Sequence, residues 1–132
     1  MKDLKKPLIH VRNLSFSYPS VTGKPIVALR NVNLTIYQGE YVAIIGPNGS
    51  GKTTLVKHFN GLLKPTSGDV IIDGINTKRA TVAQLSKIVG YIHQNPDRQL
   101  FCSRVYDEIA FGLRSRGISE SEVKRVVNRL IK

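Results

Sequence analysis

Residues 46–53 read Gly46-Pro47-Asn48-Gly49-Ser50-Gly51-Lys52-Thr53, which fits the pattern G-x-x-x-x-G-K-[ST] at every required position. An apolar run at 41–45 precedes this loop and is typical of a strand buried on both faces of a largely parallel sheet. The segment 52–63 that follows has the apolar spacing of a helix. A strand, a glycine-rich loop and a helix in this order predict a phosphate-binding site, because successive backbone N–H groups form a nest for anions.

The residue types of the loop suit the chemistry of a nucleotide. Gly49 and Gly51 permit positive φ and a close approach, because they carry no Cβ. Lys52 would reach the β- and γ-phosphates, and the Thr53 hydroxyl would be a ligand of Mg²⁺, which prefers oxygen donors. Thr54 would bond an α-phosphate oxygen. The predicted nucleotide-binding residues of this stretch are Gly46, Pro47, Asn48, Gly49, Ser50, Gly51, Lys52, Thr53 and Thr54.

Composition places the chain among ordinary globular domains. It has 132 residues, of which 41% are hydrophobic and 22% charged. Its only cysteine, Cys102, excludes an internal disulfide, and its three histidines lie far apart, which argues against a zinc site. No apolar run has the length of a membrane helix or a signal peptide, so we expect a cytosolic protein. The net charge of +11 comes from scattered basic residues, so we expect no nucleic-acid partner.

Apolar periodicity predicts the remaining elements. Near-alternation across 26–36 slips in phase near Asn31, and Ser119 with Glu122 has the spacing of a capping box. The expected strands are 9–18, 26–36, 41–45, 70–72 and 88–93, with turns at 19–25 and at Asp73-Gly74. The expected helices are 52–63, 80–86, 105–113 and 120–132.

Further motifs resemble the ATPase domain of ATP-binding cassette (ABC) transporters. Residues 46–54 have the usual wording of that family's Walker A motif, and the two strands before them match its antiparallel β-subdomain. Phe16-Ser17-Tyr18 resembles the aromatic A-loop, which implies that Tyr18 stacks on adenine. Gln94 resembles the Q-loop glutamine, which in the family touches Mg²⁺ or the attacking water and links the nucleotide to the membrane subunit. The resemblance implies ATP and Mg²⁺ as cofactors, catalytic roles for Lys52 and Gln94, and Thr53 and Gln94 as metal ligands.

The resemblance also implies the fold and the branch of the family. The expected fold is an α/β P-loop NTPase with an antiparallel β-subdomain, part of the parallel-sheet core and the start of the helical subdomain. Residues 1–94 would form the β-subdomain and Walker A core, and 95–132 the start of the helical subdomain. The wording Q-N-P-D-R-Q-L-F at 94–101 and D-E-I-A-F-G-L at 107–113 is similar to ATPases of energy-coupling-factor and cobalt/nickel-type importers.

Other motifs of the family are missing from the 132 residues. There is no L-S-G-G-Q signature and no downstream switch histidine. The segment 70–73 resembles a Walker B strand but ends in Asp73-Gly74, and the acidic pair Asp107-Glu108 does not follow a buried strand. We therefore interpret residues 1–132 as the N-terminal half of a nucleotide-binding domain and expect little or no hydrolysis from it alone.

The function implied by the resemblance is that of an ATP-binding subunit that energises an ABC-type importer of vitamins or metal ions. Its partners would be a transmembrane subunit and a second ATP-binding subunit, the same or different, at the inner face of the cell membrane. The alternatives are a non-hydrolysing ATP-binding fragment and a nucleic-acid-associated ABC protein, the latter suggested only by the charge. A P-loop GTPase or kinase is disfavoured, because no guanine-specifying or acceptor site is evident.

Overall fold

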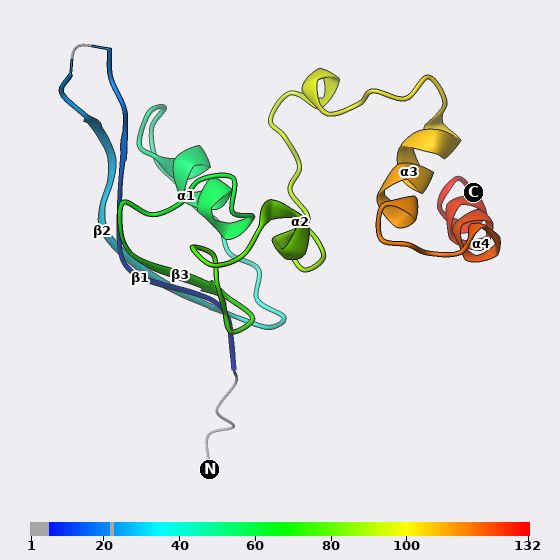
Figure 1. The fold of residues 1–132 in the computed structure, drawn as a ribbon, viewed down its shortest axis with the longest axis horizontal. Helices are drawn as coiled ribbons and strands as arrows, with labels where there is room; N and C mark the ends of the chain where they lie inside the picture. Colours follow the sequence, from blue (N-terminus) through cyan, green and yellow to red (C-terminus); the bar gives the residue numbers. More distant parts are fainter. Residues whose placement is uncertain (1–5, 22) are drawn as a thin grey trace. The chain divides into compact units, whose positions relative to one another are not determined.

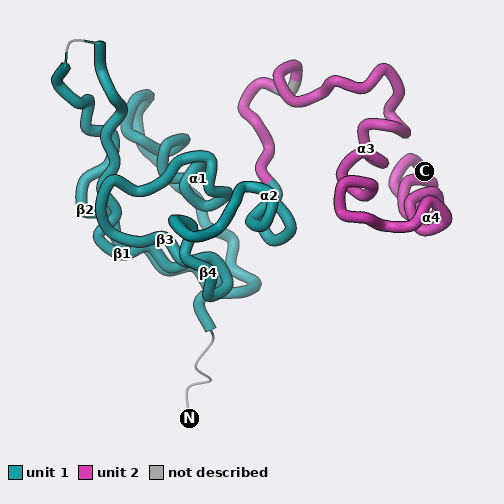
Figure 2. The backbone as a smooth tube through the Cα atoms, viewed as in Figure 1, with its two compact units in different colours: residues 1–90 teal, residues 91–132 magenta. Residues whose placement is uncertain are grey.

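The computed structural model describes residues 6–21 and 23–132 (Figure 1). The chain forms two compact units, residues 1–90 and 91–132, which we call the first and second unit (Figure 2). Among the described residues, no helix combines the length and the apolar character that crossing a membrane requires. The predicted division at residues 94 and 95 stays a prediction about domain organisation.

The first unit is built on a four-stranded antiparallel sheet. Its strands are β1 (Pro7–Tyr18), β2 (Ile26–Tyr37), β3 (Ser67–Ile72) and β4 (Ile75–Asn76), in the order β2-β1-β3-β4. The strands predicted from alternation at 9–18, 26–36 and 70–72 are therefore confirmed. The long β1–β2 hairpin dominates the unit and extends well beyond β3 (Figure 1).

The phase slip in β2 corresponds to an irregular pairing with β1. Asn13 and Asn31 have φ of 47° and 49°, and the β1–β2 register shifts between Val11 and Leu14. Asparagine tolerates this left-handed conformation better than most residues. The backbone N–H of Asn31 donates to the Ser15 hydroxyl over 3.0 Å. The slip is thus a bulge that keeps apolar side chains on both sides of it facing the core.

The hairpin between β3 and β4 turns at the predicted place. Asp73 and Gly74 have φ of 46° and 83°, the two positive values that a two-residue type I′ turn requires, and Ile72 pairs with Ile75 across it. The Asp73 carboxylate also accepts from the Lys6 ammonium over 2.9 Å.

Two helices complete the core of the first unit. They are α1 (Lys52–Phe59) and α2 (Val82–Leu85). Helix α1 ends before the predicted residue 63, because the chain turns there and the N–H of Gly61 donates to the carbonyl of His58. Helix α2 begins with a capping box between Thr81 and Gln84. Strands β1 to β3 and both helices bury one apolar cluster: Val11, Leu14, Leu29, Leu55, Phe59, Val70, Ile72, Ala80 and Leu85.

The predictions of strands at 41–45 and 88–93 are wrong for this structure. Both segments are irregular, and Tyr41, Ile45 and Ile92 are almost fully exposed. An apolar run becomes a strand only when a neighbour accepts and donates its backbone hydrogen bonds. Within the described residues neither segment has such a neighbour.

The second unit is a helical hairpin preceded by a long irregular segment. Its elements are the 3₁₀ helix η1 (Pro96–Arg98), α3 (Val105–Arg114) and α4 (Glu120–Leu130), which confirm the helices predicted at 105–113 and 120–132. Ala110, Val123 and Val127 form its core. The Arg114 guanidinium spans the hairpin to Glu120, with nitrogen–oxygen distances of 2.6 and 3.0 Å.

The capping box predicted for α4 does not form. Ser119 is the N-cap residue, but its side chain makes no capping hydrogen bond and its hydroxyl lies 3.2 Å from that of Ser121. The Glu122 carboxylate accepts instead from Arg125, over 2.9 Å from Nε. A guanidinium within one turn therefore outcompetes the backbone N–H for this carboxylate.

Candidate nucleotide-binding site

The glycine-rich loop of the first unit leads directly into α1. The N–H of Ser50 donates to the carbonyl of Pro47. The N–H of Leu55 donates to the carbonyl of Gly51, and with this hydrogen bond α1 begins. Gly49 and Gly51 have φ of 81° and 90°, so the predicted need for positive φ at both positions is confirmed. The loop thus places a helix N-terminus, with its partial positive charge, beside a turn of backbone amides.

Gly51 is also required by the packing of the loop on β2. A Cβ atom at this position would lie 2.7 Å from the carbonyl oxygen of Ala28 and 2.9 Å from Cδ2 of Leu29. At Gly49, by contrast, no atom of the described residues other than its chain neighbours lies within 4 Å of the Cβ position. The loop therefore rests against the sheet at its end and is open on the side of Gly49.

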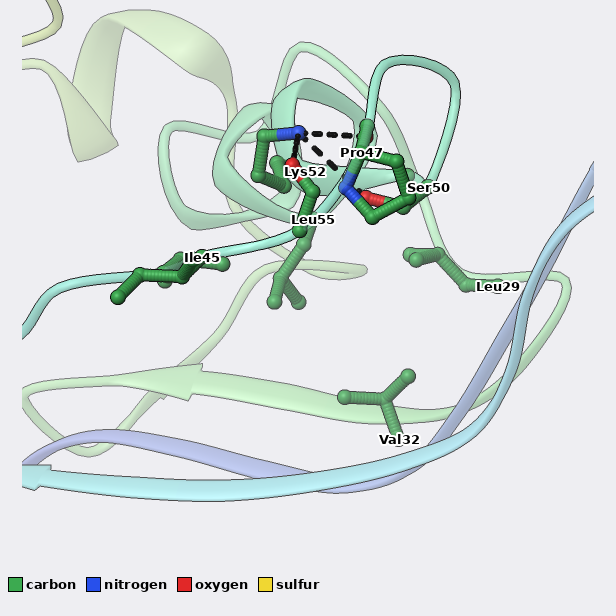
Figure 3. A pocket seen from close by; sticks show the side chains of 10 residues that line it. Leu29, Val32, Ile45, Pro47, Ser50, Lys52 and Leu55 are labelled. Carbon is green, nitrogen blue, oxygen red and sulfur yellow. Dashed lines mark hydrogen bonds between the residues drawn. The ribbon is translucent and has the colours of Figure 1, made fainter.

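The Lys52 side chain folds over the loop. Its ammonium donates to the carbonyl oxygens of Gly46 and Pro47 over 2.7 and 2.8 Å and lies 3.5 Å from the Ser50 hydroxyl (Figure 3). The positive charge of Lys52 is thus held beside the carbonyl groups of Gly46 and Pro47. A phosphate oxygen carries more negative charge than a carbonyl oxygen and would be a stronger partner for the same donors.

A pocket of about 300 Å³ lies between the loop and the sheet (Figure 3). Its wall combines the polar Ser50 and Lys52 with apolar side chains from β2, the segment before the loop and α1. The lining residues are Leu29, Val32, Ile44, Ile45, Gly46, Pro47, Ser50, Gly51, Lys52 and Leu55. Apolar side chains thus make up most of the pocket wall, and Ser50 and Lys52 contribute its polar side chains.

The two threonines after Lys52 lie in different environments. Thr53 is exposed. Thr54 is 8% exposed, and its hydroxyl lies 3.1 Å from that of Tyr18. The structure therefore brings together Tyr18, at the end of β1, and the first turn of α1, which are separated by 36 positions in the sequence.

Tyr18 is half-buried and contacts Phe16. The two rings lie almost perpendicular, at a centroid distance of 4.9 Å and an interplanar angle of 89°. This contact restricts the orientation of the Tyr18 ring, which the resemblance implicates in stacking on adenine.

Gln94 belongs to the second unit and is exposed, and its role toward the nucleotide stays a prediction. The segment before it is braced by Gln99. Oε1 of Gln99 accepts from the N–H of His93 over 2.8 Å, and Nε2 donates to the carbonyl of Tyr91 over 2.9 Å. Sequence reasoning did not single out Gln99, although it lies within the wording 94–101 that the chain shares with one branch of the family.

Asp107 and Glu108, the acidic pair that resembles catalytic carboxylates in the sequence, each have a structural partner. Glu108 accepts the backbone N–H groups of Phe101 and Cys102, and the bond from Cys102 holds the pKa of its carboxyl below the ordinary value. Asp107 lies 3.5 Å from the Arg114 guanidinium. These contacts agree with the interpretation that the pair is not catalytic.

The glycine-rich loop, the helix that follows it and the lysine folded over the loop define a P-loop nucleotide-binding protein. The family model for ABC transporters matches residues 29–131, and the chain belongs to that family. The predicted α/β P-loop NTPase class is confirmed by this match and by the structural similarity below.

Three comparisons place the chain within the family. It is 56% identical over 91% of its length to a putative ABC transporter ATP-binding protein from Pyrococcus furiosus. It is 45% identical over 98% of its length to the energy-coupling factor transporter ATP-binding protein EcfA1 of Mycoplasma mobile. The solved structure of cbiO1 from Clostridium perfringens, part of the ABC transporter complex cbiONQ, matches 95% of the chain with a TM-score of 0.78 and 35% identity.

These relatives fit the energy-coupling-factor and cobalt-type branch that the wording at 94–101 indicated. The chain spans 44%, 46% and 49% of the lengths of the three proteins, so it corresponds to about half of each.

Proposed function

We propose that the chain supplies the ATP-binding site of an ATPase subunit that energises an importer of the energy-coupling-factor type, for vitamins or metal ions. The observation that carries the proposal is the position of the Lys52 ammonium, within 2.8 Å of two carbonyl oxygens of the glycine-rich loop. The relatives named above as ATP-binding proteins support it.

The residues present fit a nucleotide phosphate chain. The open space beside Gly49 would leave room for a phosphate group, and the positive φ of Gly49 and Gly51 is compatible with a loop whose amides bind an anion. Lys52 would exchange its loop carbonyls for β- and γ-phosphate oxygens. Thr53 would be a ligand of Mg²⁺, as the resemblance also implies for Gln94, and the ion would neutralise charge that develops on the phosphates during hydrolysis. Tyr18 would stack on the adenine ring.

The whole protein would act with partners. We propose a transmembrane subunit and a second ATP-binding subunit, identical or different, and a peripheral location at the inner face of the cell membrane. The 132 residues contain no signature motif and no Walker B glutamate, so we propose that they bind ATP with little or no turnover. The scattered basic residues give no reason to add a nucleic-acid partner.

A calorimetric titration of the 132-residue chain with Mg·ATP tests the proposal. The parent should bind, and Lys52→Ala should lose most of the affinity. Lys57→Ala removes an equal charge from the last turn of the same helix and should bind like the parent. Equal affinities for Lys52→Ala and the parent would refute the assignment of the loop. Phosphate release at the rate of buffer alone is expected, and sustained turnover would contradict the proposal of a non-hydrolysing half.

A further inference from the structure

Four residues form a closed ring of contacts between the end of β1 and helix α1. The hydroxyl of Tyr18 lies 3.1 Å from that of Thr54, and the ring of Tyr18 meets Phe16. Phe16 meets His58 edge to face, with centroids 4.8 Å apart at 78°. Nδ1 of His58 lies 2.7 Å from the carbonyl oxygen of Thr54, which completes the ring.

His58 is the fully buried member of this ring. Because a carbonyl oxygen only accepts, Nδ1 of His58 carries the proton and donates to Thr54. Nε2 is then an acceptor, and it has no hydrogen-bond partner within the described part of the chain. Burial also lowers the pKa of the imidazole.

A polar ring in the core is costly to bury, and an apolar side chain of similar volume would avoid the cost. The imidazole is the side chain that meets Phe16 with a ring and Thr54 with a donor at the same time. Both contacts lead on to Tyr18. Phe16 contacts the Tyr18 ring, and the hydroxyl of Thr54 is hydrogen-bonded to the hydroxyl of Tyr18. His58 therefore bears on the position of Tyr18, because within the described residues its ring contact goes to Phe16 and its hydrogen bond goes to Thr54.

We propose that His58 is a positioning residue for the base-binding side of the nucleotide site, acting on Tyr18 through Phe16 and Thr54. The inference rests on the proposed function, because it takes Tyr18 as the residue that stacks on adenine. It predicts that the base side and the phosphate side of the site respond separately to substitution. Substitution of His58 or Phe16 should weaken binding of a nucleotide and leave binding of a bare phosphate chain intact.

The test compares two ligands, Mg·ATP and Mg·tripolyphosphate, by calorimetry on the full 132-residue chain. Tripolyphosphate has the phosphates of ATP without the base and the ribose. For the parent, ATP should bind about tenfold or more tightly than tripolyphosphate, since stacking of a base on an aromatic ring has that value. Tyr18→Leu should remove most of this difference, and Lys52→Ala should weaken both ligands.

His58→Leu keeps a side chain of similar volume and removes both the ring that contacts Phe16 and the donor to Thr54. We expect it to weaken ATP about threefold or more and to leave tripolyphosphate unchanged. His58→Phe restores the ring and should recover part of the loss. Phe16→Leu interrupts the same route at another member and should give the same selective loss, which keeps the test decisive if His58→Leu does not fold.

The possible results distinguish failure of the role of His58 from failure of the proposed function. If His58→Leu and Phe16→Leu bind both ligands like the parent, or weaken both equally, then His58 has only a structural role and the inference is overturned. If the parent binds tripolyphosphate as tightly as ATP, Tyr18 does not contribute to base binding and the inference also fails, although the phosphate-binding loop stands. If the parent binds neither ligand, the proposed function itself fails.

Discussion

The carboxamide of Gln99 is hydrogen-bonded to the backbone of His93, with 2.8 Å between Oε1 of Gln99 and the backbone nitrogen. The same carboxamide donates to the carbonyl of Tyr91 over 2.9 Å. One side chain thus pairs with the backbone on both sides of residue 92, as a neighbouring strand would. Gln94 follows immediately, so the path of the chain into the proposed Q-loop glutamine depends on Gln99.

Gln99→Leu should therefore release residues 91–93. A net hydrogen bond contributes about 1 kcal/mol, so exchange of the His93 amide should accelerate by about fivefold, as measured by NMR hydrogen exchange. Gln38→Leu, which replaces an exposed glutamine in the first unit, serves as control and should leave this amide unchanged. Unaltered exchange in Gln99→Leu would contradict the bracing role.

The two positive-φ glycines of the loop should differ in their tolerance of alanine. Gly51→Ala places a Cβ against the carbonyl oxygen of Ala28 and should lower the free energy of unfolding by about 2–3 kcal/mol through clash and strain. Gly49→Ala imposes the same strain in open space and should cost about 1 kcal/mol. Urea unfolding measures both variants. Equal losses would mean that packing of Gly51 on β2 contributes nothing.

The Tyr18 hydroxyl should make a small contribution of its own. Tyr18→Phe keeps the ring and its contact with Phe16 but removes the hydrogen bond to Thr54. The bond is present before ATP binds, so its value of about 1 kcal/mol sets an upper limit, and we expect an affinity for Mg·ATP lower by at most about fivefold in a calorimetric titration. A loss as large as that of Tyr18→Leu would instead indicate that the hydroxyl, and not the ring, determines binding.

The helical hairpin of the second unit should become less stable in acid. Hydrogen bonds from Arg114 hold the pKa of Glu120 below its ordinary value of 4.5. A carboxyl with a lowered folded pKa contributes stability that is present above its unfolded pKa and is lost as pH falls through the folded value. Glu120→Gln should therefore lower the melting temperature at neutral pH, and the difference should shrink progressively below pH 4.5.

The control for this prediction is Glu122→Gln. Its partner Arg125 lies on the same helix, so the substitution leaves the link between α3 and α4 intact and should have the smaller effect. A melting-temperature difference for Glu120→Gln that stays constant with pH would show that the ion pair with Arg114 is not responsible.

Local pattern was sufficient for much of the fold. Alternation predicted β1 and β2, apolar spacing predicted α3 and α4, and the pair Asp73-Gly74 predicted the type I′ turn, because each of these depends on residues close together in sequence. The same reasoning was wrong at 41–45 and 88–93. Apolar composition there indicates burial, but whether a strand forms depends on a partner that the pattern does not contain.

In the candidate site too, some features follow from the local sequence and others only from tertiary packing. The sequence by itself determined the glycine-rich loop, since the spacing of Gly49, Gly51 and Lys52 specifies turn, helix start and charge within one continuous segment. Only the tertiary structure decided that His58 and Phe16 join Tyr18 to Thr54. The contacts of Tyr18 with Thr54 and of Phe16 with His58 cross from β1 to α1. Side chains far apart in sequence meet only after the sheet and helix have packed together around a common core.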